Sequence, residues 1–204
     1  MRSGYAKAGQ VCTSTQIVLV QEQAFDFVRD GLERAVRNLK CGDPRSSTTN
    51  VGPLISVEEA KRVGSWIDEA ESRGGRRLCG GDREGAVLRP ALLTGVPSEA
   101  KLISAEVFGP VVSLISVCSV EEAVKIYNRT PYGLAVGIFT SDIGRAFYAA
   151  KTLRAGTVHI NSSSSSRLDV MPFGGVKDSG HGKEGPRYAI QEMTERRLAV
   201  WHGV

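Results

Sequence analysis

Hydrophobic and polar positions follow two alternating periods along the first 160 residues of the chain. Short apolar, β-branched runs predict buried strands at residues 17–20, 88–93, 111–117, 137–140 and 156–161. Stretches with apolar positions three or four residues apart predict helices at residues 24–40, 56–72, 119–128 and 143–153. Because strands and helices alternate, we predict an α/β fold with a mostly parallel, Rossmann-like twisted sheet flanked by helices.

The pattern changes after Ser162, where glycines become frequent. Their density between Gly174 and Gly185 predicts a long ordered loop. The sequence predicts a short helix at residues 188–193. It also predicts a final strand at residues 198–201, with no obvious partner strand nearby in sequence. We therefore expect a main domain at residues 1–185 and an appended helix and strand at residues 186–204.

Composition narrows the class of protein. Hydrophobic residues make up 41% of the chain and charged residues 24%, as in ordinary globular proteins. The net charge is +4, but Lys and Arg are scattered among acidic residues, so we expect no nucleic-acid partner. No apolar run approaches the roughly 20 residues that span a bilayer, and the N-terminus lacks an apolar signal region, so we expect no membrane partner.

Cysteine and histidine spacing bears on metals and on location. No two of the four cysteines are close in sequence, and no pair of histidines has the spacing of metal ligands, so we expect no metal. So few cysteines in a domain of this size do not form a disulfide framework. The sequence therefore predicts a reducing, cytoplasmic location.

Three segments contain residues that could carry chemistry. Cys12 follows a glycine-led turn and precedes a strand, so it is either a nucleophile at a cleft or a small buried residue. Glu106 lies before a Gly-Pro turn and could accept hydrogen bonds from a ribose, or be a solvated turn residue. Residues 172–180 lack both dinucleotide and P-loop spacing and better fit a loop that holds an aromatic side chain over a pocket. Pairing of Cys12 with His159, as in a thiol hydrolase, stays open.

Together these segments resemble the aldehyde dehydrogenase superfamily. The principal matches are residues 8–16 (AGQVCTSTQ), 106–110 (EVFGP) and 172–182 (PFGGVKDSGHG). Lesser matches lie at residues 52–53, 79–81, 131–134 and 156–161. All occur in the family's order and at similar intervals, so the resemblance covers essentially the whole chain.

The resemblance implies an activity and a set of site residues. Cys12 matches the nucleophile that converts an aldehyde to a carboxylic acid through a thiohemiacetal and a thioester. Glu106 and Phe108 match residues that contact the nicotinamide end of NAD or NADP. Phe173 matches a wall of the aldehyde tunnel. Arg167 lies in the family's substrate loop, where it could read a carboxylate or phosphate, the alternative being a surface pair with Asp169.

The same resemblance implies what this sequence lacks. The family's cofactor-binding domain, its general-base glutamate and an oxyanion-binding asparagine lie upstream and have no counterpart here, and Ile17 stands where arginine is common. We therefore expect residues 1–185 to be the catalytic domain, weakly active or inactive alone. Two alternatives remain: a non-catalytic assembly module, or a residual thiol esterase acting through Cys12. Residues 198–201 are expected to join copies of the chain into a homo-oligomer.

Overall fold

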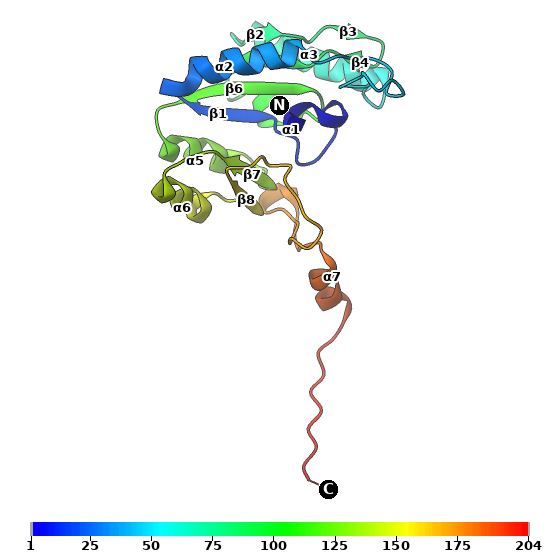
Figure 1. The fold of residues 1–204 in the computed structure, drawn as a ribbon, viewed down its shortest axis with the longest axis vertical. Helices are drawn as coiled ribbons and strands as arrows, with labels where there is room; N and C mark the ends of the chain where they lie inside the picture. The colour runs from blue at the N-terminus through cyan, green and yellow to red at the C-terminus, as the bar shows by residue number, and fades with distance from the viewer. Residues whose placement is uncertain (1, 204) are drawn as a thin grey trace.

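The computed structural model describes residues 2–203, in which short helices and strands alternate (Figure 1). The helices are α1 (Arg2–Tyr5), α2 (Glu22–Arg37), α3 (Val57–Ser72), α4 (Lys101–Ser104), α5 (Val120–Arg129), α6 (Ile143–Thr152) and α7 (Pro186–Met193), with 3-10 turns η1 (Ala6–Gly9) and η2 (Lys177–Ser179). The strands are β1 (Ile17–Gln21), β2 (Arg76–Cys79), β3 (Arg83–Glu84), β4 (Val87–Leu88), β5 (Ala91–Thr94), β6 (Val111–Val117), β7 (Ala135–Ile138) and β8 (Thr157–Ile160).

A four-stranded sheet in the order β1-β6-β5-β2 forms the larger part of the fold. Strand β6 is parallel to both β1 and β5, and β2 joins the edge antiparallel to β5. Strands β7 and β8 form a separate parallel pair, and β3 and β4 a short antiparallel hairpin. The predicted α/β fold with a mostly parallel sheet flanked by helices is confirmed.

The core lies between the four-stranded sheet and the helices packed on it. Figure 1 shows α2 and α3 along one side of this sheet, with α5, α6 and the β7–β8 pair beyond its other side. Strands β5 and β6 are almost wholly buried, whereas β7 and β8 are only half-buried. Large side chains with no measurable exposure include Leu92, Leu93, Leu102 and Leu114. Because burial of apolar area is the main stabilising term, the sheet centred on β6 is the most stable part of the chain.

Most predicted elements form, and their ends follow local chemistry. Ser56 begins α3 as expected, because its hydroxyl oxygen accepts a hydrogen bond from the Glu59 backbone N–H at 3.2 Å. The single strand predicted at residues 88–93 is wrong: it is divided into β4 and β5 at Pro90, which has no N–H to donate to a ladder. The strand predicted at 137–140 lies at 135–138 instead, in register with β8. Strands β2 and β3 were not predicted.

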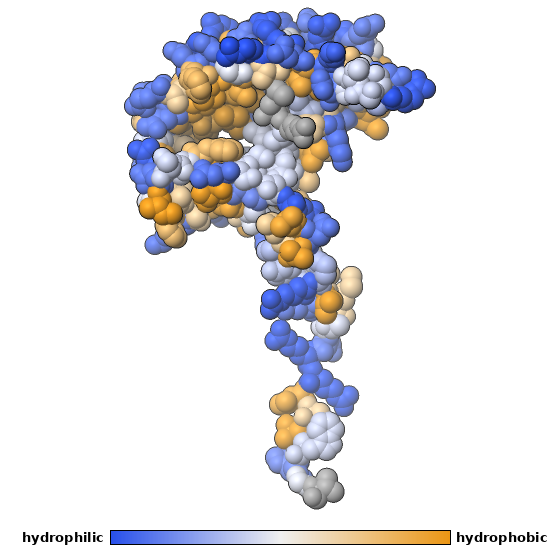
Figure 2. Space-filling view, viewed as in Figure 1, coloured by the Kyte–Doolittle hydropathy of each residue, from blue (hydrophilic) through white to orange (hydrophobic). Residues whose placement is uncertain are grey.

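The C-terminal region departs from the prediction. Helix α7 begins at Pro186, at the first helical position that proline favours. After it, residues 194–203 extend away from the rest of the molecule, and no strand is assigned at 198–201 (Figure 1). A strand requires a hydrogen-bonded partner, and none of the described residues lies beside this segment. Leu198 and Trp201 are accordingly 87% and 83% exposed, and Figure 2 shows apolar groups along this tail.

Among residues 2–203, no helix combines the length and apolar character of a membrane-spanning segment. The same residues hold no group of three or more His, Cys, Asp or Glu side chains placed to bind a metal ion.

Candidate functional site

Cys12 lies exposed in a tight turn between η1 and β1. The turn is closed by the Ser14 backbone N–H, which donates to the Val11 carbonyl oxygen at 2.8 Å. The Thr15 N–H and the Ser14 hydroxyl both donate to the Ser3 carbonyl oxygen, at 3.1 and 3.2 Å. The thiol is therefore presented to solvent by a backbone that is fixed from the N-terminal helix.

The backbone leading into this turn is left-handed over three consecutive residues. Lys7, Ala8 and Gly9 have φ of 52°, 56° and 72°. This conformation costs roughly 1–2 kcal/mol for each residue with a Cβ, and such strain concentrates at functional sites. Burial of Ala8 and a hydrogen bond from the Tyr5 hydroxyl to the Ala91 carbonyl oxygen, at 3.0 Å, hold the segment in place. Burial also raises the pKa of the Tyr5 phenol well above its usual range, so it stays a donor.

The segment before Cys12 lies directly against residues 106–110. A Cβ built on Gly9 would lie 2.0 Å from the Gly109 carbonyl oxygen, so the two backbones touch. Gln16 joins the same two segments: its side-chain oxygen accepts from the Val107 N–H at 2.9 Å, and its nitrogen donates to the Ala105 carbonyl oxygen at 2.7 Å. The structure thus brings the predicted cofactor segment to the turn that carries Cys12.

Glu106 and Phe108 point outward from this junction. Both are exposed, and among residues 2–203 the Glu106 carboxylate has no hydrogen-bond or ion-pair partner. Phe108 is 43% exposed and has a φ of 48°, which is rare for an aromatic residue. The Arg62 guanidinium steadies the adjoining backbone by donating to the Val107 carbonyl oxygen at 2.7 Å. An unpaired carboxylate beside a strained, exposed aromatic residue is an arrangement suited to a ligand rather than to packing.

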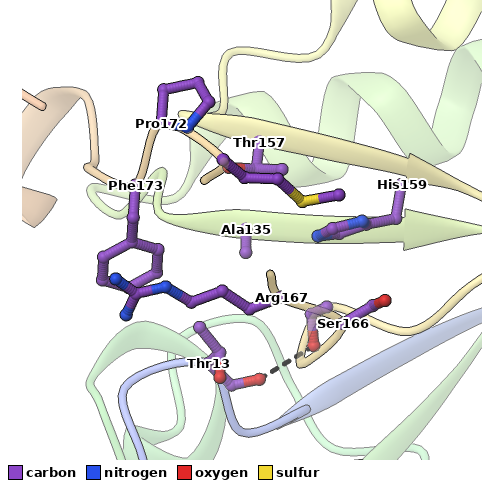
Figure 3. Close-up of a pocket in the computed structure, with 10 residues that line it drawn as sticks. Thr13, Ala135, Thr157, His159, Ser166, Arg167, Pro172 and Phe173 are labelled. Carbon is purple, nitrogen blue, oxygen red and sulfur yellow. Dashed lines mark hydrogen bonds between the residues drawn. The ribbon is translucent and has the colours of Figure 1, made fainter. Parts of the chain in front are cut away.

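Thr13, the residue after Cys12, lines a small cavity of about 20 Å³ together with Phe173 and residues of β7, β8 and the serine run at 162–166 (Figure 3). This volume holds about one water molecule, so this cavity is too small to enclose an aldehyde. His159 lines the cavity too, and no hydrogen bond joins it to Cys12 within residues 2–203. The pairing expected of a thiol hydrolase is therefore not formed here.

Arg167 is one of the residues that line this cavity. Its guanidinium carbon lies 4.1 Å from the centroid of the Phe173 ring, a stacked geometry that Figure 3 shows plainly. A guanidinium nitrogen is 3.8 Å from a carboxylate oxygen of Glu184. Among the described residues Arg167 pairs with Glu184, and the alternative of a surface pair with Asp169 is wrong. Both partners are substantially exposed, so this ion pair is weak and can exchange.

The glycine-rich loop is fixed by a lysine that the sequence analysis did not single out. The Lys177 ammonium donates to the carbonyl oxygens of Asn128, Thr130 and Tyr132 at 3.2, 3.0 and 3.2 Å. Burial lowers the pKa of this ammonium from its usual value. A short antiparallel backbone bridge joins Phe173 to Glu184, in which the Phe173 N–H donates to the Glu184 carbonyl oxygen at 3.1 Å. The sequence shows a lysine within a glycine-rich loop, which could have indicated such a role. The carbonyl oxygens that it binds belong to a segment about 45 residues upstream, so the sequence alone did not identify them.

Comparisons with known proteins agree with this arrangement. The model of the aldehyde dehydrogenase family matches residues 1–199. The chain is 40% identical over 199 residues to 3-sulfolactaldehyde dehydrogenase of Priestia aryabhattai, covering 98% of this chain and 42% of that protein. It is 41% identical over 204 residues to lactaldehyde dehydrogenase of Methanococcus maripaludis, covering 100% of this chain and 44% of the relative.

Solved structures give the same result. The structure of aldehyde dehydrogenase 21 from Physcomitrella patens, in complex with the reaction product succinate, superposes with a TM-score of 0.93 at 43% identity, over 95% of this chain and 40% of that chain. Glyceraldehyde-3-phosphate dehydrogenase from Methanocaldococcus jannaschii, complexed with NADP, superposes with a TM-score of 0.91 at 42% identity. The superposition covers 94% of this chain and 42% of that chain. The chain thus spans less than half the length of the relatives it matches.

Proposed function

Because this chain belongs to the aldehyde dehydrogenase family of oxidoreductases, we propose that it carries the catalytic half of an NAD(P)-dependent enzyme that oxidises an aldehyde to a carboxylic acid. The observation that supports this most is the place of Cys12. Its thiol is exposed, Gly9 before it packs against residues 106–110, and Thr13 after it lines the cavity at Phe173. Residues 1–185 are then the catalytic domain, and residues 186–204 an appendage.

The reaction begins with attack of the Cys12 thiolate on the aldehyde carbonyl carbon. A C–S bond forms, the C=O π pair moves onto oxygen, and the Cys12 backbone N–H donates a hydrogen bond to that oxyanion. NAD or NADP, when bound, supplies the two-electron acceptor that turns this adduct into a thioester. Water then attacks the thioester carbonyl, which releases the carboxylic acid and restores the Cys12 thiol.

The residues present fit one end of the cofactor. The unpaired Glu106 carboxylate can accept hydrogen bonds from ribose hydroxyls, and the exposed face of Phe108 can pack on a nicotinamide ring. The family's contacts to adenosine and pyrophosphate are expected outside residues 1–199. The chain alone therefore offers contacts to only part of NAD or NADP.

We propose a small aldehyde that bears an anionic or hydroxyl group as the substrate. Arg167 stacks beside the cavity on Phe173, and its weak pair with Glu184 leaves the guanidinium able to take an external carboxylate or phosphate. The relatives' names include sulfolactaldehyde and lactaldehyde dehydrogenases, and one neighbour was solved with succinate. These names describe small polar aldehydes and a dicarboxylate product.

A labelling experiment tests the assignment of Cys12. We expect substoichiometric iodoacetamide at pH 7 to modify Cys12 first, as measured by peptide mass spectrometry. Burial raises the pKa of the Cys41 and Cys79 thiols, and the hydrogen-bonded Glu122 carboxylate raises that of Cys118. Raised pKa values leave less of the reactive thiolate of Cys41, Cys79 and Cys118 at neutral pH.

Cys118 is the informative competitor because it is also exposed. In a Cys118→Ser variant the fastest labelling phase should be unchanged, whereas in Cys12→Ser it should disappear. Labelling that begins at Cys41, Cys79 or Cys118 would remove the basis for Cys12 as the nucleophile.

Cofactor affinity gives a second prediction. We expect the isolated 204-residue chain to bind NAD and NADP too weakly for calorimetric detection at micromolar concentrations, because Glu106 and Phe108 contact only the nicotinamide end. A micromolar dissociation constant would require about 8 kcal/mol from these contacts. Such an affinity would show that this chain contains a more complete cofactor site than we propose.

A second role in assembly is supported by the C-terminal tail. Leu198, Val200 and Trp201 are exposed on a segment that leaves the body of the molecule (Figure 1). We propose that it pairs with another copy in a homo-oligomer, since exposed apolar residues on an extended segment favour association. The four free cysteines are consistent with the reducing, cytoplasmic location that we propose.

A further inference from the structure

The run of five serines at residues 162–166 folds back onto the segment that carries Cys12. The hydroxyls of Ser164 and Ser165 both donate to the Thr13 carbonyl oxygen, at 2.9 and 3.1 Å. The first of these bonds is the dashed line in Figure 3. About 150 residues separate the two segments in sequence, so this contact is a product of the tertiary fold.

Two more hydroxyls extend these bonds into a network. The Ser3 hydroxyl oxygen lies 2.5 Å from the Ser165 hydroxyl oxygen and 2.8 Å from the Thr15 hydroxyl oxygen. The Thr15 hydroxyl oxygen in turn lies 3.0 Å from the Ser164 hydroxyl oxygen. Each hydroxyl has one proton. Because Ser164 and Ser165 give theirs to Thr13, they accept in their other bonds. Ser3 and Thr15 have two protons for three contacts, so one of them can donate to the other while that other donates to a serine. All four hydroxyls are thus oriented toward one carbonyl oxygen, and such chains polarise cooperatively.

The carbonyl that receives these bonds belongs to the turn around Cys12. Thr13 and Cys12 are the two central residues of the turn that Ser14 closes onto Val11. Gly9 packs against Gly109 before the turn, and Ser14 and Thr15 bond the Ser3 carbonyl oxygen after it, whereas the Thr13 carbonyl between them is bonded by the two serine hydroxyls. We propose that Ser164 and Ser165 are positioning residues for Cys12, because they hold the Thr13 carbonyl at the centre of its turn. The inference rests on the proposed role of Cys12 as nucleophile.

Two reactions of the same thiol respond differently to loss of this hold. Alkylation by iodoacetamide forms an S–C bond with loss of iodide and needs only an accessible thiolate. Acylation by p-nitrophenyl acetate forms a thioester with loss of p-nitrophenolate, and it needs the thiolate and the Cys12 N–H placed together around the developing oxyanion. A looser turn therefore slows acylation and leaves alkylation almost unchanged, whereas general unfolding accelerates alkylation of every thiol.

The test compares a Ser164→Ala/Ser165→Ala double variant with Ser72→Ala, whose lost hydroxyl also donates to a backbone carbonyl but lies at the end of α3. Hydrogen exchange across residues 11–15 is measured by mass spectrometry, together with both reaction rates at Cys12. In the double variant we expect about threefold to tenfold less exchange protection and a similar fall in the ratio of acylation to alkylation, as for loss of one or two net hydrogen bonds. Ser72→Ala should change neither quantity.

Unchanged exchange in the double variant overturns the inference, because the hydroxyls then do not hold the turn. Faster exchange with an unchanged rate ratio also overturns it, since the hold then has no effect on Cys12. If the unmodified chain shows no acylation at Cys12 at all, the proposed function fails instead, and the exchange measurement alone decides whether the serines hold the turn.

Discussion

Gly9→Ala is expected to destabilise the chain more than any other single substitution near Cys12. The new Cβ would lie 2.0 Å from the Gly109 carbonyl oxygen and 2.4 Å from its carbon, and both are backbone atoms that cannot rotate away. Alanine would also have to adopt the φ of +72° that glycine accepts without penalty. Left-handed strain and overpacking together should lower the free energy of unfolding by about 3–5 kcal/mol.

Urea denaturation followed by circular dichroism measures this change, and Gly31→Ala is its matched control. A Cβ at Gly31 would meet nothing within 4 Å, and the residue lies within α2. Because alanine has the higher helix propensity, the control should gain about 0.5–1 kcal/mol. If Gly9→Ala unfolds within 1 kcal/mol of the unmodified chain, the close contact between residues 9 and 109 does not exist in solution.

Arg167→Ala is expected to have the largest effect on substrate choice. Its measurement requires an active enzyme, such as a chimera in which residues 1–199 replace the matching part of the Methanococcus maripaludis lactaldehyde dehydrogenase. Loss of the guanidinium removes a charge-assisted contact, so kcat/KM for an anionic aldehyde such as succinic semialdehyde should fall at least about tenfold, or roughly 1.4 kcal/mol. The reaction with a neutral aldehyde of similar size should fall far less.

Equal losses with both aldehydes would assign Arg167 a structural role. Arg167 stacks on Phe173, so the alanine substitution removes packing at the cavity as well as the charge, and lost packing would slow both reactions equally. An Arg167→Met variant keeps much of the apolar stem without the charge. It should therefore match alanine with the anionic aldehyde and approach the unmodified enzyme with the neutral one.

Local patterns in the sequence were sufficient for most of the fold. The β-branched run of β6 and the helical spacing of α3 with its Ser56 cap specify their own conformations, because burial periodicity and capping act over a few residues. The division of a predicted strand at Pro90 was also readable, since proline cannot donate to a ladder. The three matched segments indicated the family, and the family model confirmed it.

Only the tertiary structure decided how these segments meet. The left-handed backbone at Lys7 and Ala8 contradicts local preference and persists because surrounding contacts hold it. The ion-pair partner of Arg167 and the hydrogen-bond partners of the Lys177 ammonium and of the Thr13 carbonyl lie between 17 and about 150 residues away along the chain. Side-chain ion pairs and hydrogen bonds over such separations follow from the packing of whole elements. The sequence by itself therefore determined most of the elements, the family and the candidate residues, and tertiary packing determined their geometry around Cys12.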